Sequence, residues 1–199
     1  AQASLWWHVA ACRCRAMQSV AHIARFQASR FTDRVKRPLW RVIWNNVQMR
    51  CGGPSKFPAK EEFLESATEV YRFLQQELMT AENTRHLEDI CTEDLWPTVR
   101  SVGAEYSSVR RQYGDDCRIV WDSTDAYVRG VGFPDEREAH GLGKSVLIAT
   151  RFFSVMSVKY APGQVRYAID ELDFVSDWDS EAGVQQWKIS RIGGPVTPE

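Results

Sequence analysis

Residues 144–160 read KSVLIATRFFSVMSVKY and residues 164–178 read QVRYAIDELDFVSDW, and these two stretches decide the fold class. In both, β-branched and aromatic residues alternate with polar ones, which is the period of a strand with one buried face. Ala161, Pro162 and Gly163 lie between them and predict a tight hairpin turn. Residues 118–131 and 185–192 alternate in the same way, so the sequence predicts four strands in an antiparallel meander.

The chain before these strands has the period of helices. Residues 58–80 predict a long amphipathic helix, with a buried stripe at Phe63, Ala67, Val70, Leu74 and Leu78. A short helix around residues 87–91 follows, and Thr92 is predicted to cap a third helix that reaches residue 106. Helices first and strands second predict an α+β domain over residues 54–199, with the helices packed on the sheet. The side chains expected in its core are Phe63, Val70, Leu74, Phe152, Tyr167, Phe174 and Trp187.

Charge divides the 199 residues into two unequal parts. Residues 1–53 contain nine Lys or Arg and one acidic residue, Asp33, which gives +8. Residues 54–199 contain 16 basic and 25 acidic residues, which gives −9. A basic extension on an acidic domain is typical of proteins that contact phosphate, whether in lipid headgroups or in RNA. Residues 51–55, CGGPS, are predicted to link the two parts.

Within the basic extension, a helix is predicted to begin at Pro38, since proline is well accommodated in the first helical turn. One face of this helix carries Leu39, Val42, Ile43, Asn46 and Val47. Trp40 and Trp44 lie beside that face, near basic residues, which is typical of helices at a membrane interface. A helix docked on a neighbouring protein fits the same pattern. The predicted contact residues are Arg34, Lys36, Arg37, Trp40, Arg41 and Trp44.

The start of the chain indicates a cellular location. It is rich in Ala, Arg, Ser and Gln and nearly free of acid, which is the composition of a mitochondrial transit peptide or its remnant. An extension that is basic only because its partner is anionic is the alternative. No run of about 18 apolar residues occurs, so no transmembrane span is predicted and any membrane association is expected to be peripheral. The five cysteines form no C-x-x-C pair, which favours a reducing compartment and predicts no metal site.

Particular residues carry a resemblance to one family. The stretches FLESATEVY (63–71) and LEDICTEDLW (87–96) resemble the opening of the C-terminal domain of the matrix-side import-motor anchor of the mitochondrial inner-membrane translocase. That family has an FL-x-x-A-x-x-x-Y helix before a short L-x-x-L-(S/T) junction. IATRF (148–152), LDFVSDW (172–178) and QWKISRI (186–192) resemble its strands, so the likeness covers residues 60–192. The chain departs from the family where W-T-F-E-R is replaced by FVSDW, and residues 130–143 read as an insert.

The resemblance implies a cone-like, nuclear-transport-factor-two-like domain, in which helices pack on a curved sheet around an apolar concavity. It also implies a place at the matrix face of the inner membrane, and the family includes a membrane-facing protein of the mitochondrial large ribosomal subunit. None of these relatives is implied to be an enzyme.

Enzymes of the wider cone fold place an Asp and a His in the concavity for acid–base chemistry. Asp122, Asp125 and His140 are the candidates here, but His140 lies in the charged segment DEREAH, where a solvated histidine is the ordinary explanation. GLGKS (141–145) resembles the end of a phosphate-binding loop, yet Glu138 stands where that loop needs glycine and a strand is predicted to follow. The sequence therefore predicts no catalytic, cofactor or metal site.

The expected function is that of a non-enzymatic structural or tethering subunit of a large mitochondrial complex at the matrix face of the inner membrane. A respiratory-chain or ATP-synthase assembly and a membrane-facing mitoribosome both fit. The expected partners are other subunits, anionic lipid such as cardiolipin, and RNA through the extension. The alternatives are an import-motor adaptor that binds a chaperone and the translocase, and a small-molecule enzyme of the cone fold.

Overall fold

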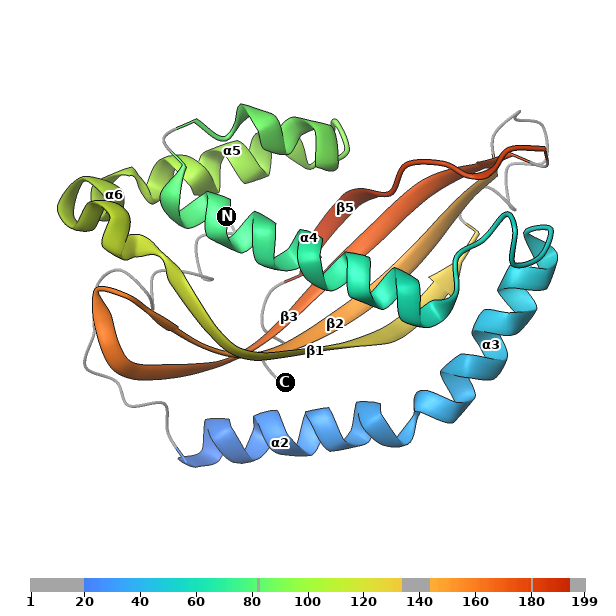
Figure 1. Cartoon of the computed structure of the whole chain (residues 1–199), viewed down its shortest axis with the longest axis horizontal. Coiled ribbons are helices and arrows are strands. Elements are labelled where there is room, and N and C mark those ends of the chain that lie inside the picture. The colour runs from blue at the N-terminus through green and yellow to red at the C-terminus, as the bar shows by residue number, and fades with distance from the viewer. Residues whose placement is uncertain (1–19, 82, 134–143, 180, 194–199) are drawn as a thin grey trace.

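The computed structural model describes residues 20–81, 83–133, 144–179 and 181–193 (Figure 1). Its helices are α2 (Val20–Val35), α3 (Arg37–Arg50), α4 (Lys60–Thr80), α5 (Trp96–Glu105) and α6 (Ser107–Tyr113), with 3-10 turns η1 (Arg85–Ile90) and η2 (Gly114–Cys117). Its strands are β1 (Ile119–Gly132), β2 (Lys144–Val158), β3 (Ala161–Asp179), β4 (Gly183–Val184) and β5 (Lys188–Gly193). The predicted α+β class, with helices before a curled antiparallel sheet, is confirmed.

The sheet follows the predicted meander, with strand order β1-β2-β3-β4 and with β5 also paired to β3. The β2–β3 turn lies at Lys159 and Tyr160, so the turn predicted at residues 161–163 is wrong: Ala161 already pairs with Val158. Backbone hydrogen bonds from η2 and the residue after it hold the turn at Lys159 and Tyr160 in place. The amides of Lys159 and Tyr160 donate to the carbonyls of Arg118 and Asp116, at 2.9 Å each.

The sheet has helices on both faces. Phe152 lies on the inner face, where Tyr71 of α4 stacks on it with ring centroids 4.4 Å apart. Its neighbour Phe153 lies on the opposite face of the sheet and packs against Phe26 of α2. Because successive strand residues point to opposite faces, β2 contributes to two separate cores. α4, α5 and η1 close the larger inner core.

The predicted core residues divide accordingly. Phe63, Leu74, Phe152 and Phe174 are buried in the inner core. Val70, Tyr167 and Trp187 are half-buried. These three were expected to be largely buried, so that prediction is wrong for them, and Tyr167 packs beneath α2 on the side of the sheet opposite the inner core.

Thr92 does not cap α5. The helix begins at Trp96, with Pro97 in its first turn and Leu95 in the capping position. The carbonyl of Thr92 accepts from the amides of Leu95 and Trp96, while its own amide donates to Ile189 of β5 at 2.9 Å. Thr92 therefore ties the helical layer to the last strand.

Residues 51–57, which include the predicted linker, are fixed to the domain. Gly52 and Gly53 turn the chain with positive φ angles of 90° and 92°, a region that favours glycine. Trp178 donates its indole N–H to the carbonyl of Cys51 at 3.0 Å, and the amide of Val184 donates to Lys56 at 2.9 Å. In residues 20–53 the basic extension is packed on the domain rather than free of it.

Candidate functional site

Aromatic packing holds the inner side of α2 to the face of the sheet that this helix covers. Phe26 is fully buried, and its ring meets Phe153 and Tyr167 edge-on with centroids 5.5 and 5.3 Å apart. His22 lies one turn earlier, with its Nε2 2.8 Å from the backbone carbonyl of Tyr167. This geometry fixes which side of α2 faces the protein.

A buried ion-pair network secures the other end of α2. Asp33 is only 2% exposed, and its two oxygens accept from Nη1 of Arg129 at 2.8 Å and Nη1 of Arg151 at 3.3 Å. Arg151 also donates to Oε1 of Glu171 from Nε and Nη2, at 2.8 and 2.5 Å. The one acidic residue of the extension is therefore buried and paired with arginines of the sheet.

The inner side of α3 enters the main core. Trp44 is 1% exposed, lies between Phe57 and Phe63 with ring centroids 5.2 and 5.3 Å away, and donates its indole N–H to the carbonyl of Pro58 at 3.0 Å. Val47 is buried beside it. α3 is therefore a structural part of the cone.

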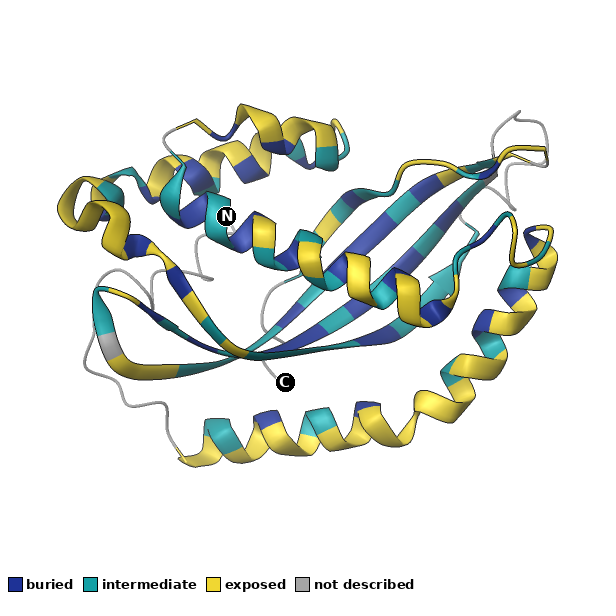
Figure 2. Cartoon of the chain, in the orientation of Figure 1, coloured by how far each residue is buried: buried dark blue, intermediate teal, exposed yellow. Residues whose placement is uncertain are grey.

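The outer sides of α2 and α3 are also apolar, and they face away from the sheet (Figure 2). We call this surface the outer face; its residues are Phe31, Val35, Leu39, Val42 and Met49. Their side chains are between 58% and 72% exposed. Within each helix their spacing of three, four or seven residues places them on one side, and the two helices meet at an angle (Figure 1). Both helices are thus amphipathic in an unusual sense, with one apolar side inside the protein and another outside.

Basic side chains border the outer face. The exposed ones in this segment are Arg25, Arg34, Lys36, Arg37, Arg41 and Arg50. Since Asp33 is buried and paired, residues 20–53 present no exposed acidic side chain. The arrangement can bind a surface that combines an apolar layer with negative charge.

The structure separates the predicted contact residues into two groups. Arg34, Lys36, Arg37 and Arg41 are exposed, as a contact requires. Trp40 is half-buried, and the prediction for Trp44 is corrected, because its ring lies in the chain's own core. Leu39 and Val42 of the outer face lie on the apolar helix face predicted from the sequence, whereas Phe31, Val35 and Met49 were not predicted. The signal for Val35 was present in its spacing from Leu39 and Val42.

Of the three residues weighed as catalytic candidates, the structure describes Asp122 and Asp125. Asp122 is exposed on β1, and Asp125 forms an ion pair with Arg30 of α2. His140 lies outside the described residues. The GLGKS stretch was predicted to lead into a strand, and β2 does begin at its Lys144.

A different acid lies inside the cone. Asp170 of β3 is buried and accepts a hydrogen bond of 2.5 Å from the hydroxyl of Tyr71, which in turn accepts from Ser154 at 3.2 Å. Burial raises the pKa of Asp170 to about 6, and the hydrogen bond from Tyr71 opposes that rise. The ring of Tyr71 lies between Phe152 and Trp121 and occupies the space in front of the carboxyl group.

The raised pKa of Asp170 makes stability depend on pH. The folded state holds this proton more tightly than the unfolded state, so stability contributed by protonation is present below about pH 4 and is lost as pH rises to about 6. We expect Asp170→Asn to remove a decline of roughly 2–3 kcal/mol between these pH values. Urea unfolding of both proteins at several pH values measures it, with the exposed Asp122→Asn as control. An unchanged pH profile in Asp170→Asn would contradict the assignment.

Comparison of the sequence with family models and with curated proteins gives no match. Among the described residues, no helix is long and apolar enough to cross a membrane. The same part of the chain contains no group of three or more His, Cys, Asp or Glu that could hold a metal ion. Within it, Cys51, Cys91 and Cys117 are buried as free thiols. The cysteines at positions 12 and 14 lie outside the described residues.

Proposed function

We propose that this protein is a non-enzymatic tethering subunit that attaches to the matrix face of the mitochondrial inner membrane through the outer face of α2 and α3. One observation carries the proposal: an exposed apolar stripe, bordered by basic side chains, lies on helices that are themselves locked to the domain. The resemblance of residues 60–192 to the import-motor anchor family supports the location, as does the transit-peptide-like composition of the chain's start.

The energetics favour a membrane surface as the first partner. An apolar side chain contributes about 1.5–3 kcal/mol when fully buried, and a basic residue near an anionic membrane contributes about 1 kcal/mol. Five apolar side chains of the outer face and their basic neighbours therefore supply attachment without a transmembrane span. Binding to RNA explains the basic residues but gives no role to the exposed aliphatic side chains Val35, Leu39 and Val42.

The acidic domain is the part left to bind other subunits. Residues 54–199 carry −9, so an anionic membrane repels them and holds the molecule with the domain directed away from the surface. In this orientation the protein tethers a matrix-side assembly to the membrane. An import-motor adaptor uses the same orientation but binds its partners transiently.

The test removes the apolar stripe and keeps the charge. We expect a triple variant, Phe31→Gln, Val42→Gln and Met49→Gln, to bind vesicles of phosphatidylcholine and cardiolipin about 100-fold more weakly than the unmodified protein, because three side chains lose about 1 kcal/mol each. Co-sedimentation at a series of lipid concentrations measures the change. The fold should be retained, since all three residues are at least 59% exposed.

Phe73→Gln is the matched control, because Phe73 is an exposed aromatic residue on α4, outside this surface. If the triple variant binds vesicles normally but no longer co-isolates with its complex, the outer face is a protein contact. If neither property changes, the proposed attachment is wrong. Carbonate extraction of mitochondria separately tests peripheral attachment, since a peripheral protein should be released.

A further inference from the structure

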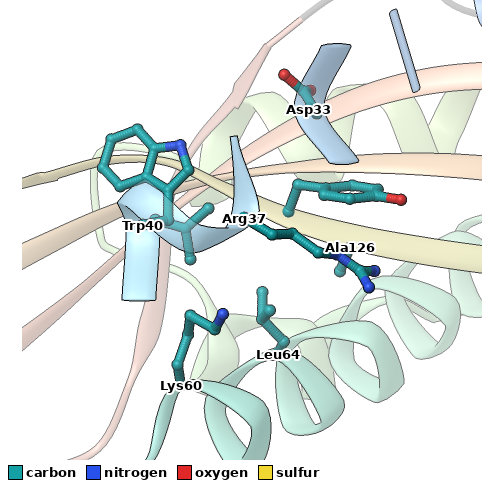
Figure 3. A pocket seen from close by; sticks show the side chains of 8 residues that line it. Asp33, Arg37, Trp40, Lys60, Leu64 and Ala126 are labelled. Atoms are coloured by element: carbon teal, nitrogen blue, oxygen red, sulfur yellow. The ribbon is translucent and has the colours of Figure 1, made fainter. Parts of the chain in front are cut away.

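A small cavity lies at the elbow where α2 gives way to α3, and we call it the elbow pocket (Figure 3). Its volume is about 20 Å³, enough for one oxygen-sized atom. Asp33 comes from α2, Arg37 and Trp40 from α3, Lys60 from α4 and Tyr127 from β1. Four elements therefore build it, and in Figure 3 Lys60 reaches toward the space from α4, while Arg37 runs along it with its guanidinium group directed toward Ala126.

The cations of the elbow pocket are poorly neutralised. Lys60 is 9% exposed, and among the residues that the structure describes its Nζ forms an ion pair only with Glu61, 3.3 Å away, whose side chain is 69% exposed. Arg37 lies over the ring of Tyr127, 4.8 Å from its centroid, and within the described ranges it has no carboxylate partner. A buried ammonium group is costly unless a counter-charge accompanies it, so this site favours an anion.

The acidic residue that lines the elbow pocket does not cancel this charge. Both oxygens of Asp33 already accept from arginines outside the lining, Arg129 and Arg151. Lys60 is also the first residue of the 21-residue helix α4, whose capping residue Ala59 supplies no side-chain hydrogen bond. The positive end of the helix dipole adds to the two cations, and Glu61 and Glu62 in the first turn of α4 offset part of it.

We propose that the elbow pocket is a binding site for a phosphate group, one oxygen of which enters the cavity between Lys60 and Arg37. An ammonium and a guanidinium group suit this ligand, because each donates charge-assisted hydrogen bonds to phosphate oxygens. The remaining oxygens stay at the mouth, since the cavity is too small for a whole phosphate. A lipid headgroup and a soluble phosphate share this chemistry, so the site does not depend on membrane attachment.

Binding of a soluble phosphate is tested by an NMR titration of the full chain with inorganic phosphate and with glycerophosphoglycerol. We expect the amide signals of residues 126–128 to shift in a saturable way, and Lys60→Met to weaken the affinity at least about tenfold. Arg37→Gln should weaken it as well. Arg34→Gln is the matched control, because it removes the same charge from an exposed position that does not line the cavity.

A second measurement tests the lipid source. Phosphatidylcholine vesicles given equal negative charge by cardiolipin or by oleate differ in whether the anionic lipid carries phosphate. A preference for cardiolipin that is lost in Lys60→Met shows that the site takes a headgroup, whereas saturable binding of inorganic phosphate alone shows a soluble ligand. No saturable shift with any phosphate probe overturns the proposal, as does equal weakening in Arg34→Gln. Vesicle binding that persists without phosphate binding refutes the site and leaves the tethering function standing.

Discussion

Trp44→Ala should lower the free energy of unfolding by about 3–5 kcal/mol, which is the range for removing a large aromatic side chain from a packed core. Trp44 is 1% exposed and fills the space between Phe57 and Phe63, where α3 meets the start of α4. Its indole N–H also satisfies the carbonyl of Pro58, which loses this partner in the variant. Urea unfolding measures the effect as a lower midpoint.

Two further substitutions show whether the loss of stability comes from the buried ring of Trp44 or from any apolar side chain of α3. Trp44→Phe keeps a ring but loses the hydrogen bond, so we expect a smaller loss of about 1–3 kcal/mol. Val42→Ala removes an apolar side chain from the same helix on its exposed side and should change stability by less than about 0.5 kcal/mol. If Trp44→Ala unfolds at the same urea concentration as the unmodified protein, α3 is not part of the core.

The sequence of α3 shows why its orientation could not be predicted. Val42 and Trp44 are both apolar, and the three-to-four spacing runs along both sides of the helix, so periodicity identifies a helix without selecting the buried side. The aromatic side faces the core because Phe57 and Phe63 offer it a space of matching size. That partner becomes visible only when the chain is folded.

The sheet was predictable to a greater degree, because alternation in β2 and β3 is a local property of the chain. The long-range polar contacts carry no such signal. Asp33 stands out in the sequence as a lone acid in a basic segment, but its partners Arg129 and Arg151 lie 96 and 118 residues away. Asp170 and Tyr71 are 99 residues apart, and although Tyr71 closes the FLESATEVY stretch, nothing in the sequence pairs it with Asp170.

Asp33→Ala should lower the free energy of unfolding by about 3 kcal/mol and release α2 from the sheet. Removing one partner from a buried ion pair costs about 3–5 kcal/mol, because the other charge stays buried without compensation. We expect the lower part of this range for two reasons. Arg151 keeps its pair with Glu171, and the Arg129 side chain is 32% exposed, so water can solvate part of its charge.

A double-mutant cycle tests whether this network holds α2. Asp33→Ala and Arg151→Met should couple by about 1–3 kcal/mol, since the two residues contact each other within one ion-pair network. Amide exchange within α2 should rise in Asp33→Ala, while exchange within α4 follows global stability. Arg34→Ala, the neighbouring exposed substitution, should change neither quantity. Additive effects of the two substitutions, or unchanged exchange in α2, would show that the other contacts of the helix, made by His22, Phe26 and Arg30, anchor it. In that case the outer face would keep its orientation without the ion pairs of Asp33.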